Sequence, residues 1–514
     1  MKIKSLLVGM LACTAMVSCT NEEALENNEV IKGGEKSYMS VNLVAPSSVS
    51  GRAASDFVAG STGEVKVNDA VFLFLDENFA GCAEPFYTNT LNFGDATGEG
   101  QDKEATVLVI DGAKEVPTYL VAVLNPTKSY TATTTLADLK AEHAAYTAYT
   151  TENFVMSNAV YKAANGKEAA ATPVTMDYIF DTVAKAKAKP LTVQVERVVG
   201  KVAVNLNGAA EEWEGDEHID DAEKKELKLV VTGWEILQNI ESTLVKNVDL
   251  AWNHTWWNDL TLNRSYWAKD YTAAGRNELL VDEMEVPTSG FRYVEETVSQ
   301  TANTAEVDNV NPYLVVAAKF VDAETEEEVE LVEWRGRKYT KEGYLNFIAG
   351  NSKVSQYWTK SGDTYTSFSA DLLKMVDDEA TDWKAIAALK DEATEFFTCT
   401  FKSDGTVNVA TPANIEDVKA AIAEFGDVQY WNGGRTYYYT PIKHQTVGTD
   451  NYYGVVRNHV YNVKITGISG YGTPVSDPEQ AIEIPEKPVD DKSFLAAEVV
   501  ILDWKVVNND VELN

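Results

Sequence analysis

Cysteine and histidine are both scarce in this sequence, which has four cysteines and five histidines among 514 residues. Cys13 and Cys19 lie near the N-terminus, and Cys82 and Cys399 are far apart, so the chain offers neither a disulfide framework nor a CxxC metal site. The histidines are scattered, and the motifs HExxH, GxSxG and GxGxxG and the P-loop are absent. We therefore expect no catalytic residue, no metal ligand and no cofactor.

Positive charge is also in short supply. The chain has 44 Lys and Arg residues against 79 Asp and Glu residues, a net charge of −35. Nucleic-acid binding requires a basic surface to neutralise phosphates, so this balance argues against a nucleic-acid partner. A strongly acidic chain suits a protein that stays soluble outside the cell.

Long apolar runs are missing as well. The only pronounced run before the globular part is residues 6–17, which follows Lys2 and Lys4 and is too short to span a bilayer. It ends in MVSC at residues 16–19, which resembles a bacterial lipobox. We therefore expect residues 1–18 to be a lipoprotein signal peptide, with cleavage before Cys19 and lipidation of its thiol. The alternative is an ordinary secretory signal in which this cysteine occurs by chance.

Short apolar or alternating segments bounded by turn residues are the dominant pattern, and they are typical of strands. They predict strands at residues 37–45, 70–75, 105–110, 119–124, 191–204, 227–237, 313–320, 328–334 and 455–468. Helical spacing predicts helices at residues 136–146, 382–397 and 415–425. The fold expected is mainly β: tandem β-sandwiches with a few helical insertions.

Two local signals organise these strands. The basic, weakly apolar segment KAKAKP at residues 185–190 marks a domain boundary, so we expect one domain at 53–190 and a second at 191–473. The pair Asn432-Gly433 is a strong signal for a hairpin turn.

The chain near its two ends carries a functional pattern. Residues 37–45 are followed by a small-residue loop, 46–54, which contains one basic residue, Arg52. Exposed loops of small residues are where proteases cut. At the other end, a tether rich in proline and acidic residues, 474–492, leads into a long strand-like run at 494–513.

The apolar pattern of the last strand indicates how copies of the chain are joined. One face of it carries Val500, Leu502, Trp504 and Val506, and the other face is also largely apolar, so the strand needs a covered position. If a protease cut the N-terminal loop, the strand at 37–45 could leave its sheet, and the last strand of another copy could take its place. Such contacts do not close, so they build a head-to-tail filament. Trp504 is the residue we expect to anchor the joining strand.

Four segments carry a resemblance to a known family. They are KSYMS at 36–40 with Arg52 beyond it, TVQVER at 192–197, VVRNHVY at 455–461, and residues 494–513. Together with the lipobox, they resemble the Bacteroidia fimbrillins, the major subunits of type V pili, and most closely the short-fimbria (Mfa-type) major subunit.

The resemblance implies a fold of two transthyretin-like β-sandwich domains and a donor strand at 474–514. It also implies export as a lipoprotein, removal of residues 19–52 by an arginine-specific protease that cuts between Arg52 and Ala53, and polymerisation by donor-strand exchange. The implied partners are other copies of the chain, anchor and tip fimbrial subunits, and receptors on host or bacterial surfaces. The precursor would reach the outer membrane, and the product would be a surface fimbria that supports adhesion and biofilm formation.

Other functions stay open at this point. A monomeric surface lipoprotein that binds glycans is suggested by the tryptophans Trp252, Trp256, Trp257 and Trp267, although such a cluster also occurs in packed loops. An enzyme has no supporting motif. Asp76-Glu77-Asn78 faintly resembles a calcium loop but lacks the later oxygen ligands, so we expect a turn there.

Overall fold

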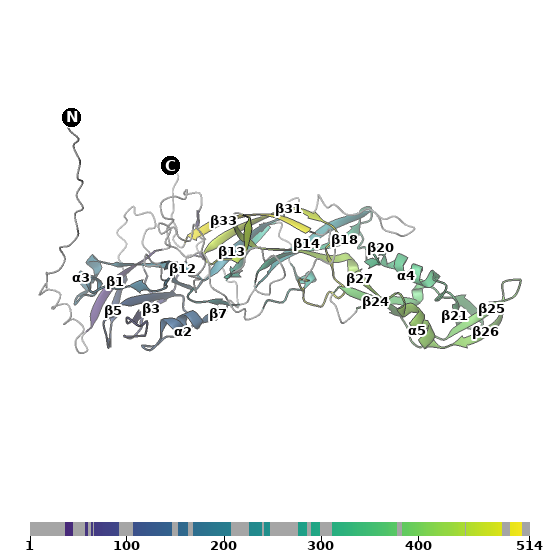
Figure 1. Ribbon diagram of the computed structural model, residues 1–514, viewed down its shortest axis with the longest axis horizontal. Helices are drawn as coiled ribbons and strands as arrows, with labels where there is room; N and C mark the ends of the chain where they lie inside the picture. Colours follow the sequence, from purple (N-terminus) through teal and green to yellow (C-terminus); the bar gives the residue numbers. More distant parts are fainter. Residues whose placement is uncertain are drawn as a thin grey trace, which may run out of the picture.

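The protein is described here from a computed structural model. It describes residues 36–44, 57–59, 63–64, 66–91, 106–145, 153–162, 168–206, 226–238, 241–246, 276–284, 289–298, 311–377, 383–447, 449–485 and 494–505. These residues form three lobes that follow one another along an elongated molecule (Figure 1).

The first lobe is an eight-stranded sheet around its own core. Its strand order is β4 (Phe86–Thr88), β3 (Ala70–Leu75), β6 (Tyr119–Leu124), β8 (Met156–Asn158), β12 (Leu191–Arg197), β1 (Ser37–Val44) and β5 (Thr106–Ile110), and β11 (Thr172–Pro173) also pairs with β6. All six residues of β3 are buried, which explains its unbroken apolar sequence. The lobe also contains α2 (Leu136–Ala141), α3 (Val183–Ala188), η2 (Met176–Tyr178), β7 (His143–Ala145) and the pair β9 (Tyr161–Lys162) and β10 (Glu168–Ala169).

The second lobe is a sandwich of two sheets. One sheet has the order β16 (Ser289–Glu295), β13 (Val199–Asn205), β31 (His459–Ser469), β33 (Phe494–Lys505) and β2 (Phe57–Ala59); the other has β14 (Leu227–Leu237), β18 (Tyr313–Asp322), β28 (Arg435–Pro441) and β32 (Thr473–Pro474). Buried side chains from both sheets, including Val202, Trp234, Phe320 and Tyr461, form one core between them. Near this lobe lie β15 (Glu241–Thr243), β17 (Thr297–Val298), β29 (Lys443–Val447), β30 (Asp450–Val455) and η3 (Val281–Glu283).

A third lobe is inserted between β18 and β28, and the sequence patterns did not indicate it. It holds the sheet β20 (Arg337–Thr340), β19 (Leu331–Trp334), β27 (Asp427–Trp431), β24 (Lys384–Leu389) and β23 (Leu373–Asp377), and the sheet β22 (Thr364–Ser367), β21 (Tyr357–Ser361), β25 (Phe396–Phe401) and β26 (Val407–Ala413). With α4 (Lys341–Gly350), α5 (Ile415–Ala423) and η4 (Ala370–Leu372) they enclose a separate core. This lobe forms the end of the molecule farthest from β1 (Figure 1).

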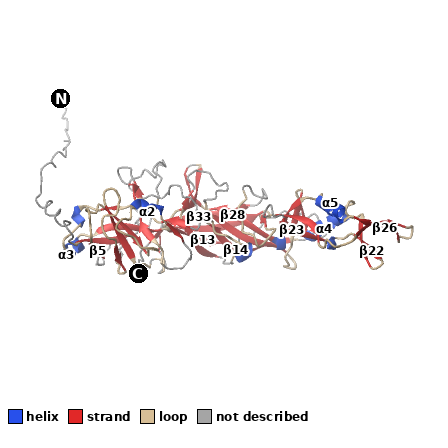
Figure 2. Ribbon diagram, turned by 90° about the horizontal axis from the view of Figure 1, so that it is seen from below, coloured by secondary structure: helices blue, strands red, loops and turns tan. Residues whose placement is uncertain are grey.

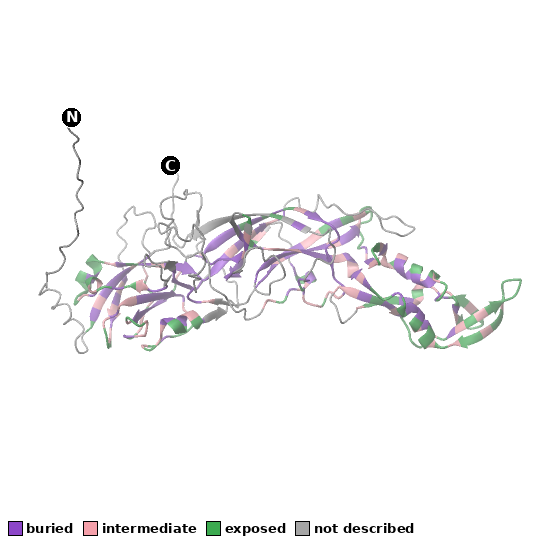
Figure 3. Cartoon of the chain, viewed as in Figure 1, coloured by how far each residue is buried: buried purple, intermediate pink, exposed green. Residues whose placement is uncertain are grey.

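The expectation of a mainly β fold with a few helices is confirmed. Strands dominate all three lobes, and the helices are short and peripheral (Figure 2). Each lobe has its own line of buried residues, whereas the distal end of the third lobe is largely exposed (Figure 3). Among the described residues, no helix is long and apolar enough to cross a membrane.

The boundary between the first and second sheets differs from the domain boundary that the sequence predicts. β12, expected to open the second domain, pairs with β1 and β8 in the first sheet, and Val193 and Val195 lie in the first core. The change of sheets falls at Val198, between β12 and β13. The segment KAKAKP was read as a break, but most of it forms α3, which Thr182 caps by accepting a hydrogen bond from the Lys185 N–H.

The helix predictions have mixed outcomes. The helix at 415–425 is confirmed as α5, and the helix at 136–146 begins correctly at Leu136 but ends at Ala141, where β7 follows. The prediction of a helix at 382–397 is wrong. β24 and β25 occupy that segment, and burial alternates along β24 even though its alanines favour a helix.

The prediction of a hairpin turn at Asn432-Gly433 is also wrong. These residues lie in η5 (Asn432–Gly434), which joins β27 of the third lobe to β28 of the second, so the flanking strands belong to different sheets. Gly433 and Gly434 have φ angles of 61° and 71°, and a Cβ on Gly434 would lie 2.5 Å from the Phe320 carbonyl oxygen. The two glycines therefore allow the chain to turn tightly where it passes from one sheet to the other.

The third lobe can be tested through its core. Ile348 is fully buried on α4, whereas Ile386 on β24 is 42% exposed. Ile348→Ala should destabilise the protein by about 2–5 kcal/mol because it leaves a cavity. Ile386→Ala is the matched control and should cost well under half as much. Chemical denaturation followed by tryptophan fluorescence measures both, and equal losses would contradict the description of this core.

Candidate assembly site

β1 is an inner strand of the first sheet. It pairs antiparallel with β5 through residues 37–41 and parallel with β12 through residues 41–44. Met39, Val41 and Leu43 are fully buried in the first core, so one face of β1 is part of that core. The strand predicted at 37–45 is therefore confirmed, and it occupies a place with hydrogen-bonded neighbours on both sides.

Further contacts hold β1 at its start. The backbone of Tyr38 exchanges two hydrogen bonds with Phe180, the Tyr38 N–H to the Phe180 oxygen at 2.7 Å and the Phe180 N–H to the Tyr38 oxygen at 2.8 Å. The Ser40 hydroxyl donates to the Thr106 carbonyl oxygen, and the Lys36 ammonium pairs with Asp111 at 3.0 Å on the surface. A sheet that lost β1 would expose both its core and the facing edges of β5 and β12.

β33, the strand expected to join copies, lies in its own chain in this single copy. It runs antiparallel to β31 along its length, from Phe494 opposite Ser469 to Asp503 opposite His459. Leu495 is buried in the core of the second lobe, and the end of β33 pairs with β2. Of the residues expected on its joining face, Val500, Leu502 and Trp504 belong to this strand, and Val506 lies outside the described residues.

The processing residues also fall outside the described part of the chain. This applies to Cys19, Arg52 and Ala53, and to the four tryptophans considered for glycan binding. They remain predictions from the sequence.

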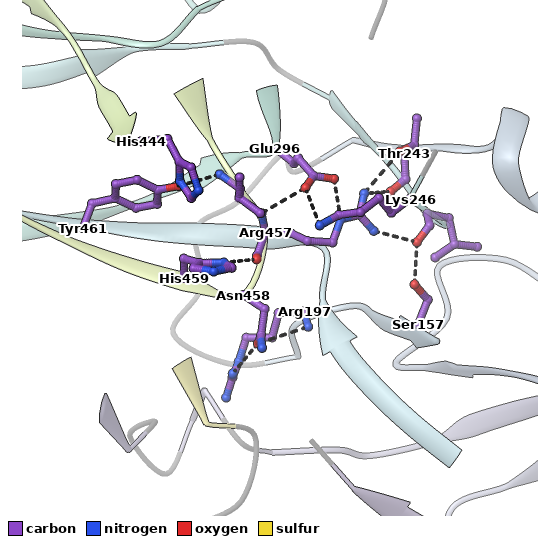
Figure 4. A network of polar contacts seen from close by, with 12 residues as sticks. Ser157, Arg197, Thr243, Lys246, Glu296, His444, Arg457, Asn458, His459 and Tyr461 are labelled. Carbon is purple, nitrogen blue, oxygen red and sulfur yellow. Dashed lines mark hydrogen bonds and ion pairs between the residues drawn. The ribbon is translucent and has the colours of Figure 1, made fainter. Parts of the chain in front are cut away.

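Between the first and second lobes lies a buried polar joint. Arg457 is fully buried, and its Nε donates to Glu296 Oε2 at 2.6 Å while its Nη atoms donate to the carbonyl oxygens of Thr243 and Leu244 (Figure 4). Lys246, also fully buried, pairs with Glu296 at 3.1 Å. Arg457 lies just before β31, so its side chain connects this strand to residues 241–246.

Residues 241–246 are themselves part of the first lobe. β15 pairs with β7, the Leu244 carbonyl oxygen accepts from the Ser157 hydroxyl at 2.6 Å, and the side chains of Leu244 and Val245 lie in the first core. Arg457 therefore links the two lobes through a segment that is anchored in both.

A second group of contacts crosses the same joint. Arg197, fully buried at the end of β12, donates from Nη1 to Asn458 Oδ1 at 3.2 Å and from Nε to the Glu64 carbonyl oxygen at 3.0 Å. The Glu64 carboxylate accepts from Lys201 Nζ and from the Tyr293 hydroxyl, each at 2.7 Å. Asn458 has a φ of 58°, which asparagine tolerates better than most residues.

The electrostatics keep these groups in defined states. Burial alone would raise the pKa of Glu296, but Arg457 and Lys246 outweigh burial and hold the pKa below its ordinary value. Burial, helped by the hydrogen bond to Glu64, raises the pKa of Tyr293, so its hydroxyl stays a donor. The joint therefore consists of buried charged groups that hydrogen bonds hold in place, an arrangement that fixes geometry.

The histidines near this joint are satisfied within the fold. His459 is buried and its Nδ1 donates to the Arg457 carbonyl oxygen at 2.7 Å. The Tyr461 hydroxyl lies 2.7 Å from His444 Nδ1 and accepts from the Val456 N–H at 2.8 Å. Within the described residues, no group of three or more His, Cys, Asp or Glu side chains could hold a metal ion.

Other candidate sites have structural explanations. Asp76 Oδ1 accepts from the N–H groups of Asn78 and Ala80, which confirms a turn. Cys82 and Cys399 are free thiols, and burial raises the pKa of Cys82 to about 12. Tyr439 packs edge-on against Tyr313 on the neighbouring strand with ring centroids 6.1 Å apart.

Sequence patterns pointed to Arg457, Asn458 and Tyr461 only through the resemblance, and they missed Glu64, Glu296 and Lys246 entirely. The available signal was an arginine and a histidine in the otherwise apolar run VVRNHVY. A charged residue inside such a run indicates buried partners, but those of the Arg457 side chain lie more than 150 residues away in the sequence and could not be identified from it.

One comparison with known families supports the resemblance to fimbrillins, without confirming the Mfa type. The family model for the C-terminal part of fimbrillin, described as major fimbrial subunit protein type IV, matches residues 429–510. No curated protein matches the chain significantly.

Among solved structures, a proposed cell adhesion protein from Parabacteroides distasonis is 11% identical over 93% of this chain and 98% of its own, with a TM-score of 0.38. The tip fimbrial protein Mfa3 from Porphyromonas gingivalis, truncated at its C-terminus, is 11% identical over 91% of this chain and 100% of its own, with a TM-score of 0.28. A fimbrial assembly protein from Parabacteroides distasonis is 10% identical over 74% of this chain and 100% of its own, with a TM-score of 0.26.

The buried joint makes a direct prediction. Arg457→Met removes the partner of the buried Glu296 and should destabilise the protein by about 3–5 kcal/mol. The control is Lys185→Met, which breaks the exposed Lys185–Asp181 pair and should cost about 0–1 kcal/mol. Denaturant unfolding measures both changes, and losses of similar size would contradict the role of Arg457 in the joint.

Proposed function

We propose that this chain, whose residues 429–510 match the family model for the C-terminal part of fimbrillin, is a polymerising subunit of a cell-surface fimbria. The polymer forms head to tail. Each copy offers the place of β1 as an acceptor groove and its own C-terminal strand as the donor. No catalytic step belongs to this function.

The observation that carries the proposal is the position of β1. It is an inner strand, it is joined to the rest of the chain through residues 45–56, and that connection contains Arg52. A cut there separates a buried strand from its lobe without cutting any described element. The vacated groove would present unpaired backbone groups of β5 and β12 and the apolar surface that Met39, Val41 and Leu43 now cover.

Such a groove favours a replacement strand strongly. Burying three apolar side chains of this size contributes about 1.5–3 kcal/mol each, and strand addition also restores main-chain hydrogen bonds. Residues 494–513 supply alternating apolar side chains over a comparable length, with Val500, Leu502, Trp504 and Val506 on one face. To donate this strand, a copy must release β33 from β31.

The earlier steps follow from the N-terminal sequence. The precursor is exported with a lipoprotein signal, residues 1–18, and is lipidated on Cys19, which holds it at the outer membrane. An arginine-specific protease then cuts between Arg52 and Ala53. Anchor and tip subunits of the same fimbria and surface receptors are the further partners.

The cleavage step can be tested by mutation. Purified protein treated with an arginine-specific protease should form filaments visible by electron microscopy, and the N-terminal residue of the filaments should be Ala53. Arg52→Ala should stay monomeric because β1 keeps its place. Arg335→Ala, at an exposed turn of the third lobe, is the control and should polymerise normally. Filaments that retain residues 19–52 would contradict the proposal.

The donor step needs a separate test. Leu502→Asp places a charge on the face expected to enter the groove, and it should abolish filaments while cleavage at Arg52 proceeds. Leu502→Met conserves volume and should polymerise, and the melting temperatures show whether each monomer is folded. Long filaments from Leu502→Asp would exclude donation by this face. A protein that stayed monomeric in every arm and bound a glycan array would support the monomeric glycan-binding alternative instead.

A further inference from the structure

A short strand that follows the proposed cleavage site pairs with the end of the donor strand. β2, residues 57–59, pairs parallel with the end of β33: Phe57 is opposite Asp503, Val58 opposite Trp504 and Ala59 opposite Lys505. On its other side, Asp503 is opposite His459 of β31. This end of β33 therefore has strand neighbours on both sides, and one of them, β2, follows the proposed cleavage site by only a few residues.

The segment that includes β2 is fixed at its downstream end. Glu64 is 1% exposed, its carboxylate accepts from Lys201 and Tyr293 at 2.7 Å, and its carbonyl oxygen accepts from Arg197 at 3.0 Å. Lys201 and Tyr293 belong to β13 and β16, which lie in the same sheet as β33. Glu64 therefore fixes the chain shortly after β2 to the lobe that contains the donor strand, and we call β2 the strap.

The upstream end of the strap is fixed by β1. β1 ends at Val44 and is held in the first sheet by pairing on both sides. In the uncut chain, residues 45–63 thus connect two fixed points, β1 and Glu64, and β2 lies between them. A short strand tied at both ends returns to its partner after each opening, because the ties keep its local concentration high.

A cut after Arg52 changes this situation. β2 then lies near a new chain end, and chain ends fray because only one tie remains. The same peptide bond whose cleavage frees β1 also loosens the strand that covers the end of β33.

We propose that the strap is an autoinhibitory contact that holds the donor strand in its own subunit until the N-terminal cut is made. This inference rests on the proposed function and adds a regulation to it. One cleavage prepares the acceptor groove and also releases the donor strand. An uncut subunit would then be inactive in both roles, which would prevent lipidated precursors from capping growing filaments.

The two roles can be separated by mixing full-length chains. The acceptor is cleaved Leu502→Asp protein, which has an open groove and a disabled donor strand. The donors are uncut Arg52→Ala protein and uncut Arg52→Ala/Val58→Pro protein, in which proline removes a backbone donor from β2 and disfavours its pairing. Each pair can form only a one-to-one dimer, and size-exclusion chromatography over time measures its formation. Arg52→Ala/Val58→Thr keeps a β-branched residue in β2 and is the matched control.

The strap predicts that Arg52→Ala and its Val58→Thr form donate slowly, and that the Val58→Pro form donates at least about tenfold faster. Equal rates for all three donors would overturn the strap while leaving donor-strand exchange intact. The strap would also be overturned if none of the three donors formed a dimer while cleaved wild-type protein still polymerised in parallel. Failure of the cleaved wild-type protein to polymerise would instead overturn the proposed function itself. Equal melting temperatures of the donors show that Val58→Pro acts locally.

Discussion

The first sheet requires a strand between β5 and β12. Both neighbours direct backbone hydrogen bonds into that place, and Met39, Val41 and Leu43 of β1 close the core beneath it. An empty place would leave buried polar groups unpaired and apolar surface in water, so some strand has to fill it. The proposed assembly follows from this constraint, because β1 is held by contacts within its lobe and is followed by the connection that contains Arg52, the proposed cleavage site.

The polar joint ties the first lobe to the second. Arg457 reaches Glu296 in one direction and the backbone of residues 241–246 in the other, and all these groups are buried. A buried ion pair adds little net stability compared with an apolar contact, but it requires aligned partners. Its main effect is therefore on geometry: the first and second lobes have one preferred orientation. Glu64 extends the joint to the residues that follow the cleavage site.

Sequence patterns predicted the elements that depend on local periodicity. β14 was predicted at its observed bounds, and β1 and β3 within a residue, because each alternates or is continuously apolar over its length. They failed where tertiary contacts override local preference. The alanine-rich segment around β24 forms a strand because the third core covers alternate residues, and the glycine turn after β27 changes sheets. The third lobe was not recognised because its strands look like those of the second.

The sequence by itself determined the mainly β class of the protein and its net charge of −35, and it predicts a lipoprotein signal, an arginine in a loop that a protease cuts and a last strand with apolar residues on both faces. Periodicity and composition are local properties, and they suffice for these features. Only the tertiary structure decided that β12 belongs to the first sheet, that β33 rests beside β31 in a single copy, and that Glu64 and Arg457 meet partners across the joint. Those outcomes depend on pairings between residues up to several hundred positions apart, which no local pattern encodes.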